Sequence, residues 1–167
     1  MMMNSKTGRA VWRGLALAGI VAGAMSAGSL SAFAGSCPAD KVVPPGQGQK
    51  PGAAMPKDVT DTVIGSIDLS KEPAAINDRT FRLRKLVIQA GGVVPWHSHG
   101  DRPAIIYVVD GEITEYASTC AVPIIHKAGD VAVETHDTSH WWKNTGKKPV
   151  VLLSSDLLHD PMDTNMM

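Results

Sequence analysis

Short runs of alternating or β-branched apolar residues, separated by turn residues, fill the chain from about residue 58 onward. Successive side chains of a strand point to opposite faces, so this alternation predicts half-buried strands. No run keeps the three- and four-residue apolar spacing of a long helix. The expected strands are residues 63–69, 80–89, 93–99, 104–109, 112–116, 122–126, 131–135, 140–144 and 150–155. Strands this short and this closely spaced predict an all-β sandwich or barrel.

The first 34 residues follow a different pattern. Three cations precede an apolar centre at residues 15–25, and the small-x-small motif Ala32-Phe33-Ala34 follows it. This order is typical of a Sec-type signal peptide over residues 1–34, cleaved before Gly35. The alternative is a permanent membrane anchor, but a span needs about 20 predominantly apolar residues, and glycines and serines dilute this stretch. We therefore expect a periplasmic or secreted protein.

The segment between the signal and the strands is rich in proline and glycine. Proline removes ladder donors and glycine raises the entropy cost of folding, so residues 35–57 are expected to form a flexible leader. The folded domain is expected over residues 58–160, a length that suits one β domain, with a C-terminal tail at 161–167.

Composition and charge narrow the class of protein. Apolar residues make up 44% of the chain and charged residues 19%, which is a globular composition. Three of the 16 basic residues and none of the 16 acidic residues lie in the first 34, so the remaining chain has a net charge of −3. That balance excludes nucleic acid as the main partner, and after signal cleavage it gives no reason to expect a membrane partner.

Two histidines two residues apart are the first candidate metal ligands. In a strand, His97 and His99 would point to the same face, close enough to share one metal ion. Imidazole suits zinc, copper, iron and nickel. The pair alone is more typical of surface polar residues than of a metal site, so the surrounding spacing matters. It runs through Gly91, His97, His99 and Gly111, and then through Gly129, Thr135, Asp137, His140 and Asn144.

These spacings resemble the two motifs of the cupin superfamily, which are small β-barrels of jelly-roll type. The resemblance covers Gly91 to Asn144, and it implies that His97, His99 and His140 bind one divalent transition metal (Fe, Cu, Zn or Ni) inside the barrel. Gly111 and Gly129 would serve turns, where glycine tolerates positive φ. The resemblance also implies a homodimer.

The sequence departs from the family pattern at Ala104, where the first motif usually has a glutamate. A methyl group cannot coordinate, so the site would consist of three neutral imidazoles with open positions for water or substrate. Loss of a hard carboxylate disfavours manganese. A carboxylate from Asp101, Glu112 or Glu115 could replace it, or the barrel could have lost its metal; the sequence leaves these alternatives open.

Strand phase suggests which residues surround the site. Trp142 shares its phase with His140 and would face inward, where it could wall a pocket or simply pack in the core. His126, His136 and His159 lie outside the motif frame and are expected at the surface or in turns. The expected pocket residues are Trp96, Ala104, Ile106, Trp142 and Asn144.

The two cysteines, Cys37 and Cys120, would both lie in an oxidising compartment after export. We expect a disulfide that ties the leader to the folded domain; the alternative is a free thiol at Cys120 near the pocket.

Three functions are compatible with these features. The resemblance implies, as the most concrete enzymatic expectation, a metal-dependent dioxygenase acting on a small enol, diketone or thiol-like substrate. The alternative is a non-enzymatic cupin that binds a metal or a small ligand for sensing, storage or delivery. The third is a metal-free structural barrel. In the first two cases the partner is a small molecule.

Overall fold

A computed structural model describes residues 35–159. The expected signal peptide (1–34) and tail (161–167) lie outside the described residues. The described part contains two short 3₁₀ turns, η1 (Ala39–Lys41) and η2 (Leu69–Lys71), and otherwise strands and loops. The strands are β1 (Lys57–Asp68), β2 (Thr80–Ser98), β3 (Ala104–Asp110), β4 (Glu112–Ala117), β5 (Ile124–Lys127), β6 (Val131–Glu134), β7 (Ser139–Lys143) and β8 (Val150–Leu158). No helix within residues 35–159 has the length and apolar character needed to cross a membrane.

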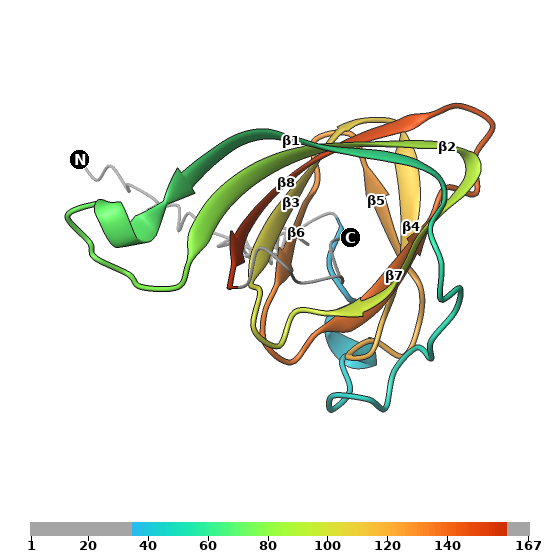
Figure 1. Ribbon diagram of the computed structural model, residues 1–167. Helices are drawn as coiled ribbons and strands as arrows, with labels where there is room; N and C mark the ends of the chain where they lie inside the picture. Colours follow the sequence, from blue (N-terminus) through green and yellow to red (C-terminus); the bar gives the residue numbers. More distant parts are fainter. Residues whose placement is uncertain (1–34, 160–167) are drawn as a thin grey trace, which may run out of the picture. The chain divides into compact units, whose positions relative to one another are not determined.

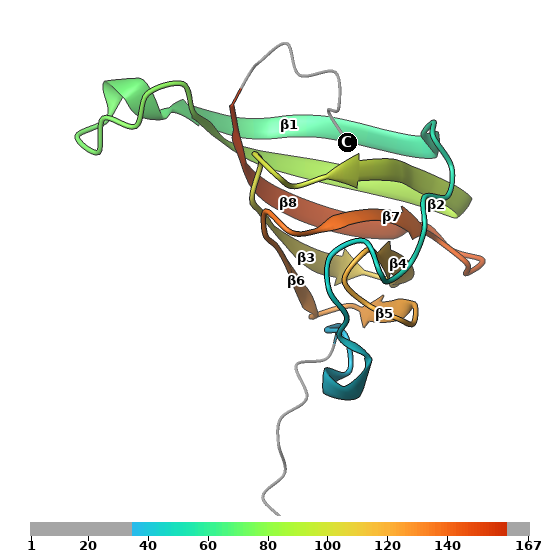
Figure 2. The ribbon, with the colours of Figure 1, turned by 90° about the horizontal axis from the view of Figure 1, so that it is seen from below.

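All strand pairs are antiparallel, in the order β5-β4-β7-β2-β8-β3-β6, and β1 pairs separately with β2. Figure 1 shows the strands curling around a common interior, and Figure 2 shows β1 lying along β2 on the outside of this arrangement. The all-β jelly-roll barrel expected from the sequence is confirmed.

Strand β2 joins two of the expected strands into one. Its first half, from Thr80 to Ile88, pairs with β8, and its second half, from Val93 to Ser98, pairs with β7. The change of partner falls at Gly91 and Gly92. Gly91 has a φ of +77°, and a Cβ at Gly92 would lie 2.8 Å from the Gln89 carbonyl oxygen. Glycine therefore permits a bend that other residues would resist, and the strand continues through it.

The apolar core lies inside the curled sheet and comes from alternate positions of several strands. Ile88, Val108 and Ile113 are completely buried, and Trp142 and Val150 are 1% exposed. On β3 the alternation matches the predicted phase, because Ala104, Ile106 and Val108 are buried while the residues between them are exposed. Two members of this core, Ile106 and Trp142, also border the buried polar side chains described below.

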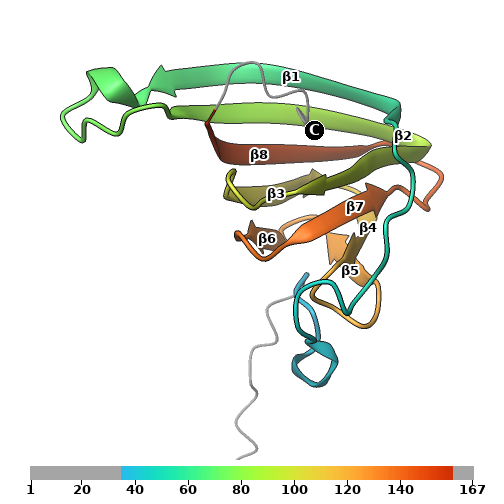
Figure 3. The same ribbon diagram turned by 60° about the horizontal axis from the view of Figure 1, so that its bottom comes forward.

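The leader is held against the barrel rather than lying free, which differs from the flexible segment expected. The Val43 amide donates to the Thr119 carbonyl, and the Trp96 amide donates to the Ala53 carbonyl. Cys37 and Cys120 are linked by a disulfide. In Figure 3 the leader runs from β1 past β7 to the end of the barrel formed by β4 and β5. Hydrogen bonds to strand β2 and to the loop after β4, which composition does not reveal, hold this segment.

Candidate metal centre

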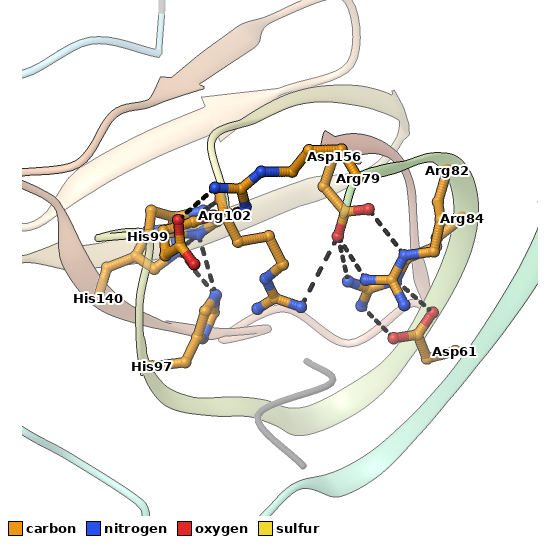
Figure 4. A network of polar contacts seen from close by, with 10 residues as sticks. Asp61, Arg79, Arg82, Arg84, His97, His99, Arg102, His140 and Asp156 are labelled. Carbon is orange, nitrogen blue, oxygen red and sulfur yellow. Dashed lines mark hydrogen bonds and ion pairs between the residues drawn. The ribbon is translucent and has the colours of Figure 1, made fainter. Parts of the chain in front are cut away.

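The three predicted histidines meet inside the barrel because β2 and β7 pair in one register. His97 and His140 are directly opposite one another across that pair, and His99 follows one residue after β2 ends. All three are buried, with His140 completely inaccessible. Figure 4 shows the three rings pointing toward one another. The pairing of β2 with β7 therefore brings His140 next to His97 and His99, although they are far apart in sequence.

The Nε2 atoms of the three rings form a small triangle. The separations are 3.1 Å for His97 and His99, 2.9 Å for His99 and His140, and 3.1 Å for His140 and His97. Nitrogen ligands lie at about 2.0–2.1 Å from zinc, so two of them at right angles would be about 3 Å apart. The spacing of the triangle thus fits three ligands on one face of a transition-metal ion.

The opposite nitrogen of each ring fixes the tautomer. Nδ1 lies 2.9 Å from the Pro95 carbonyl oxygen in His97, 2.7 Å from the Arg102 carbonyl oxygen in His99, and 2.7 Å from Glu115 Oε1 in His140. These oxygens accept, so each Nδ1 carries the hydrogen and each Nε2 carries a lone pair.

The Trp142 indole N–H also approaches His140 Nδ1, at 3.1 Å. The shorter contact to a carboxylate decides the tautomer, because an unprotonated Nδ1 would repel that oxygen. When all three rings are neutral, three lone pairs face one point, an arrangement that a bound cation would stabilise.

Burial keeps two of these rings neutral. It lowers the pKa of His97 to about 2, with the charge of His140 adding to the effect, and lowers the pKa of His99 to about 3 for the same reasons. Neutral imidazole is the form that binds a metal. For His140, burial alone would lower the pKa, but the charges of Glu134 and Glu115 outweigh it and raise the pKa.

Glu115, which the sequence offered only as an alternative ligand, supports His140 instead. It is 3% exposed and lies on β4, where its two oxygens contact His140 Nδ1 and His126 Nε2 at 2.7 and 2.8 Å. Burial would raise its pKa, but the hydrogen bonds from His126 and His140 outweigh that effect and lower the pKa to about 2. Glu115 is therefore a fixed negative charge that orients a candidate ligand.

The expectation that His126 lies at the surface is wrong. Its ring is fully buried, stacks on Trp142 with ring centres 4.5 Å apart, and completes the hydrogen-bonded chain through Glu115. The sequence gives only a weak signal for this role, because His126 is recognised through its partner Glu115. Glu115 lies on β4, where three consecutive residues from Ile113 to Glu115 are buried and the alternation is broken.

Glu134 is a second buried carboxylate missed by the sequence reading. Its Oε1 lies 3.5 Å from His140 Nδ1, on the side of the ring away from the Nε2 triangle. Burial raises its pKa to about 8, against the charge of His140 and with that of Glu115. Because Glu134 contacts the Nδ1 side of His140, it does not take the place of the missing motif glutamate beside the Nε2 atoms.

The barrel interior beside the imidazoles also holds a cluster of buried charges. Arg82 donates to both oxygens of Asp156, at 2.9 and 2.7 Å, and Arg84 donates to Asp156 at 3.1 Å and to Asp61. Arg102 Nη1 lies 3.7 Å from the same Asp156 oxygen. Figure 4 shows Arg102 between the imidazoles and Asp156.

A small cavity of about 20 Å³ lies between the imidazoles and this cluster, enough for about one water-sized group. Of the expected pocket residues, Ile106 and Trp142 line it, whereas Trp96, Ala104 and Asn144 do not. The amide nitrogen of Asn144 donates instead to the carbonyls of Ile88, Gln89 and Lys148, which holds the loop after β7. That role is structural.

The other carboxylates that the sequence offered lie at the surface. Asp101 pairs with Arg79 and His159, and Glu112 approaches Lys127. His136 and His159 are exposed, as expected.

Comparison with known proteins bears on the family and the fold. Residues 84–156 match the family model described as "Cupin domain". A germin-like protein (subfamily 2 member 2) of Arabidopsis thaliana is 27% identical over 110 residues, which is 62% of this chain and 50% of that protein, so the chain spans about half the length of this curated relative.

Among solved structures, a predicted oxalate decarboxylase of Thermotoga maritima covers 70% of this chain and 97% of its own, at 22% identity and a TM-score of 0.50. At that identity the likeness shows the fold alone. The cupin domain of Schizosaccharomyces pombe Cnp3 covers 64% of this chain and 69% of its own, at 17% identity and a TM-score of 0.48.

Proposed function

This chain belongs to the cupin superfamily, and we propose on that basis that its barrel binds one divalent transition metal through His97, His99 and His140. The observation that carries the proposal is the meeting of three Nε2 lone pairs within 3.1 Å while every Nδ1 faces an acceptor. In a structural barrel without a metal this arrangement would be unfavourable, because burying three Nε2 lone pairs face to face without a cation costs free energy.

The surrounding residues hold the ligands and keep water away. Two backbone carbonyls and the Glu115 carboxylate fix the orientation of the rings, so little reorganisation accompanies metal binding. Trp142 and Ile106 cover the apolar side of the cavity. Three neutral ligands leave the charge of a divalent ion intact, and the absence of a ligating carboxylate favours Fe, Cu, Zn or Ni over Mn.

For the reaction, we propose a metal-dependent oxygenation of a small enol, diketone or thiol-like substrate. A redox-active metal would supply Lewis acidity and an open position for dioxygen. The cavity of about 20 Å³ has room for about one water-sized group, so even a small substrate would require side chains to move and a bulky one would require larger displacements, which supports a small substrate.

A non-enzymatic binder is the second candidate, and one observation favours it. The cavity-lining carboxylate, Asp156, is engaged by arginines and is therefore a poor general base. A barrel of this kind could hold a metal or small ligand for sensing, storage or delivery without turning it over.

Export is part of the proposal. Disulfides persist in oxidising compartments, and Cys37, only a few residues after the predicted cleavage site, is linked to Cys120. We place the working protein in the periplasm or outside the cell.

The decisive experiment is elemental analysis of the purified protein and of His97→Ala. About one equivalent of metal in the parent protein, with most of it lost in the variant, supports the proposal; metal-free parent protein after incubation with Fe²⁺, Cu²⁺, Zn²⁺ and Ni²⁺ refutes it. Asn144→Ser serves as a control that changes a buried polar residue away from the imidazoles. Oxygen uptake with small enols and thiols then separates the enzyme from the binder.

A further inference from the structure

One ring nitrogen of His126 is buried without a partner. Its other nitrogen, Nε2, lies 2.8 Å from Glu115 Oε2, which accepts, so Nε2 carries the hydrogen and Nδ1 carries a lone pair. The ring is completely buried, and Nδ1 has no hydrogen-bond partner among residues 35–159. Buried acceptors without a donor are unfavourable and uncommon, so a donor is expected at this nitrogen.

Gly35 lies directly against this nitrogen. A Cβ at residue 35 would be 2.6 Å from His126 Nδ1 and 2.9 Å from Asp130 Cβ, so a larger residue would have to displace these groups. The disulfide between Cys37 and Cys120 holds Gly35 in this place, because two residues of chain span at most about 7 Å. The close approach therefore requires glycine at the residue that follows the proposed cleavage site.

Cleavage before Gly35 would turn its backbone nitrogen into an α-ammonium group. The nitrogen and the Cβ position of one residue are about 2.5 Å apart, so the Gly35 nitrogen lies no more than about 5 Å from His126 Nδ1 and about 6 Å from Asp130 Cγ. In the uncleaved chain this nitrogen is an amide joined to Ala34, and it does not donate to Nδ1. An ammonium group has three donors, and rotation about the Cα–C bond alone would direct them.

The surroundings of Gly35 favour a positive charge. Asp130 is half-buried, its Oδ2 accepts from the Lys127 amide at 2.8 Å, and no side-chain cation within residues 35–159 pairs with it. Gly35 also borders a cavity of about 600 Å³ whose lining includes Glu115 and Glu134 and no basic side chain. Attraction between opposite charges is stronger in such a partly buried place than in water.

We propose that signal cleavage creates an α-ammonium group at Gly35 that binds His126 Nδ1 and Asp130, and that this contact strengthens the metal centre. The inference rests on the proposed export and metal binding. With both nitrogens engaged, the His126 ring holds Glu115, which in turn accepts from His140 Nδ1 at 2.7 Å. Processing of the chain would thus complete a series of hydrogen bonds that runs from the new N-terminus to a candidate ligand.

The first measurement is the reactivity of the α-amino group in the exported, disulfide-linked protein, with its N-terminus identified by sequencing. An aldehyde reagent selective for α-amino groups is added, and the product is followed by mass spectrometry. The reaction should be at least tenfold slower in the folded protein than in urea, because the bound ammonium is protected.

Two variants remove the contact in different ways. An extra alanine inserted between Ala34 and Gly35 moves the ammonium group one residue away, and Asp130→Asn removes the charge while keeping an acceptor for the Lys127 amide. Both should lose the protection. Asp40→Asn is the matched control, because Asp40 lies in the same leader but pairs with Lys41 at the surface, and it should react like the parent protein.

The second measurement is Zn²⁺ affinity, by competition with a coloured chelator. The chain with the extra alanine and Asp130→Asn should bind Zn²⁺ severalfold more weakly than the parent protein, and Asp40→Asn should bind equally well. Asp130→Asn leaves the chain length unchanged, so it decides the test if the lengthened chain does not fold.

The outcomes separate the proposals. A chain that begins at Gly35 but whose α-amino group reacts as fast as in urea overturns the contact while export stands, and a chain that begins at another residue overturns both. Equal Zn²⁺ affinity in all four proteins overturns the link to the metal centre. Parent protein that takes up no Zn²⁺ overturns the metal centre itself, and the reactivity of the α-amino group then decides the contact alone.

Discussion

Removing the charge of Glu115 tests whether its hydrogen bond to His140 contributes to metal binding. Glu115 accepts the Nδ1 hydrogen of His140 at 2.7 Å and is almost completely buried. Carboxylates in this position orient a ligand and raise its basicity, and losing one lowers metal affinity about 10–100-fold, or about 1.4–2.7 kcal/mol. Glu115→Gln keeps an acceptor oxygen and should fall at the lower end, whereas Glu115→Ala should fall at the upper end.

The assay is competition for Zn²⁺ or Co²⁺ with a coloured chelator of known affinity. Glu112→Gln is the matched control, since Glu112 lies on the same strand and its side chain is 55% exposed. Its affinity should equal that of the parent protein. Equal affinities for all four proteins, with the Glu115 variants folded by circular dichroism, would refute the reasoning, because a carboxylate that merely packs in the core would leave metal binding unchanged.

Three further predictions concern export and stability. N-terminal sequencing of the protein recovered from its native compartment should begin at Gly35; a chain that still begins at Met1 contradicts cleavage. The Cys37→Ser, Cys120→Ser double variant should lose about 2–5 kcal/mol of unfolding free energy in urea, because the disulfide closes a loop with a sequence separation of 83. Burial would raise the pKa of Asp156, but the hydrogen bonds and charge of Arg82, with the charges of the other arginines, outweigh it and lower the pKa below its ordinary 3.8. A depressed pKa stabilises the folded state above about pH 4, so this contribution should disappear as pH falls through the lowered value, and urea unfolding of Asp156→Asn should lack that dependence.

The alternation of the sequence predicted the strands and, on β3, which residues are buried, but it did not predict the buried face at the start of β2. In residues 81–84, arginine and large apolar residues alternate, which would ordinarily place the arginines in solvent. The structure does the reverse: Arg82 and Arg84 are buried, whereas Phe81 and Leu83 are 40% and 38% exposed. The period of a strand gives two faces without saying which is inward. The acids that pair with these arginines come from distant strands.

The candidate ligands were predictable because motif spacing and strand period both apply to them. His97 and His99 share a face by period, and the second motif supplies His140. The roles of Glu115 and His126 were not predictable. Their hydrogen bond depends on the pairing of β4 with β5 and on a break in the alternation of β4. The contacts of the leader could not be predicted for a related reason: proline and glycine predict the absence of regular structure, not the absence of contacts.

Ala104 shows how a departure from a family pattern follows from the neighbouring strands. It pairs with Glu134 on β6 and with Asp156 on β8, and all three positions are buried. A glutamate at 104 would therefore place a third buried carboxyl group between two others, and burying it without a partner of its own would cost free energy. With alanine at the centre, Asp156 can serve the arginines and Glu134 can lie behind His140. Neither carboxylate joins the group of His97, His99 and His140, so at the proposed metal centre the three imidazoles would be the protein ligands that residues 35–159 supply.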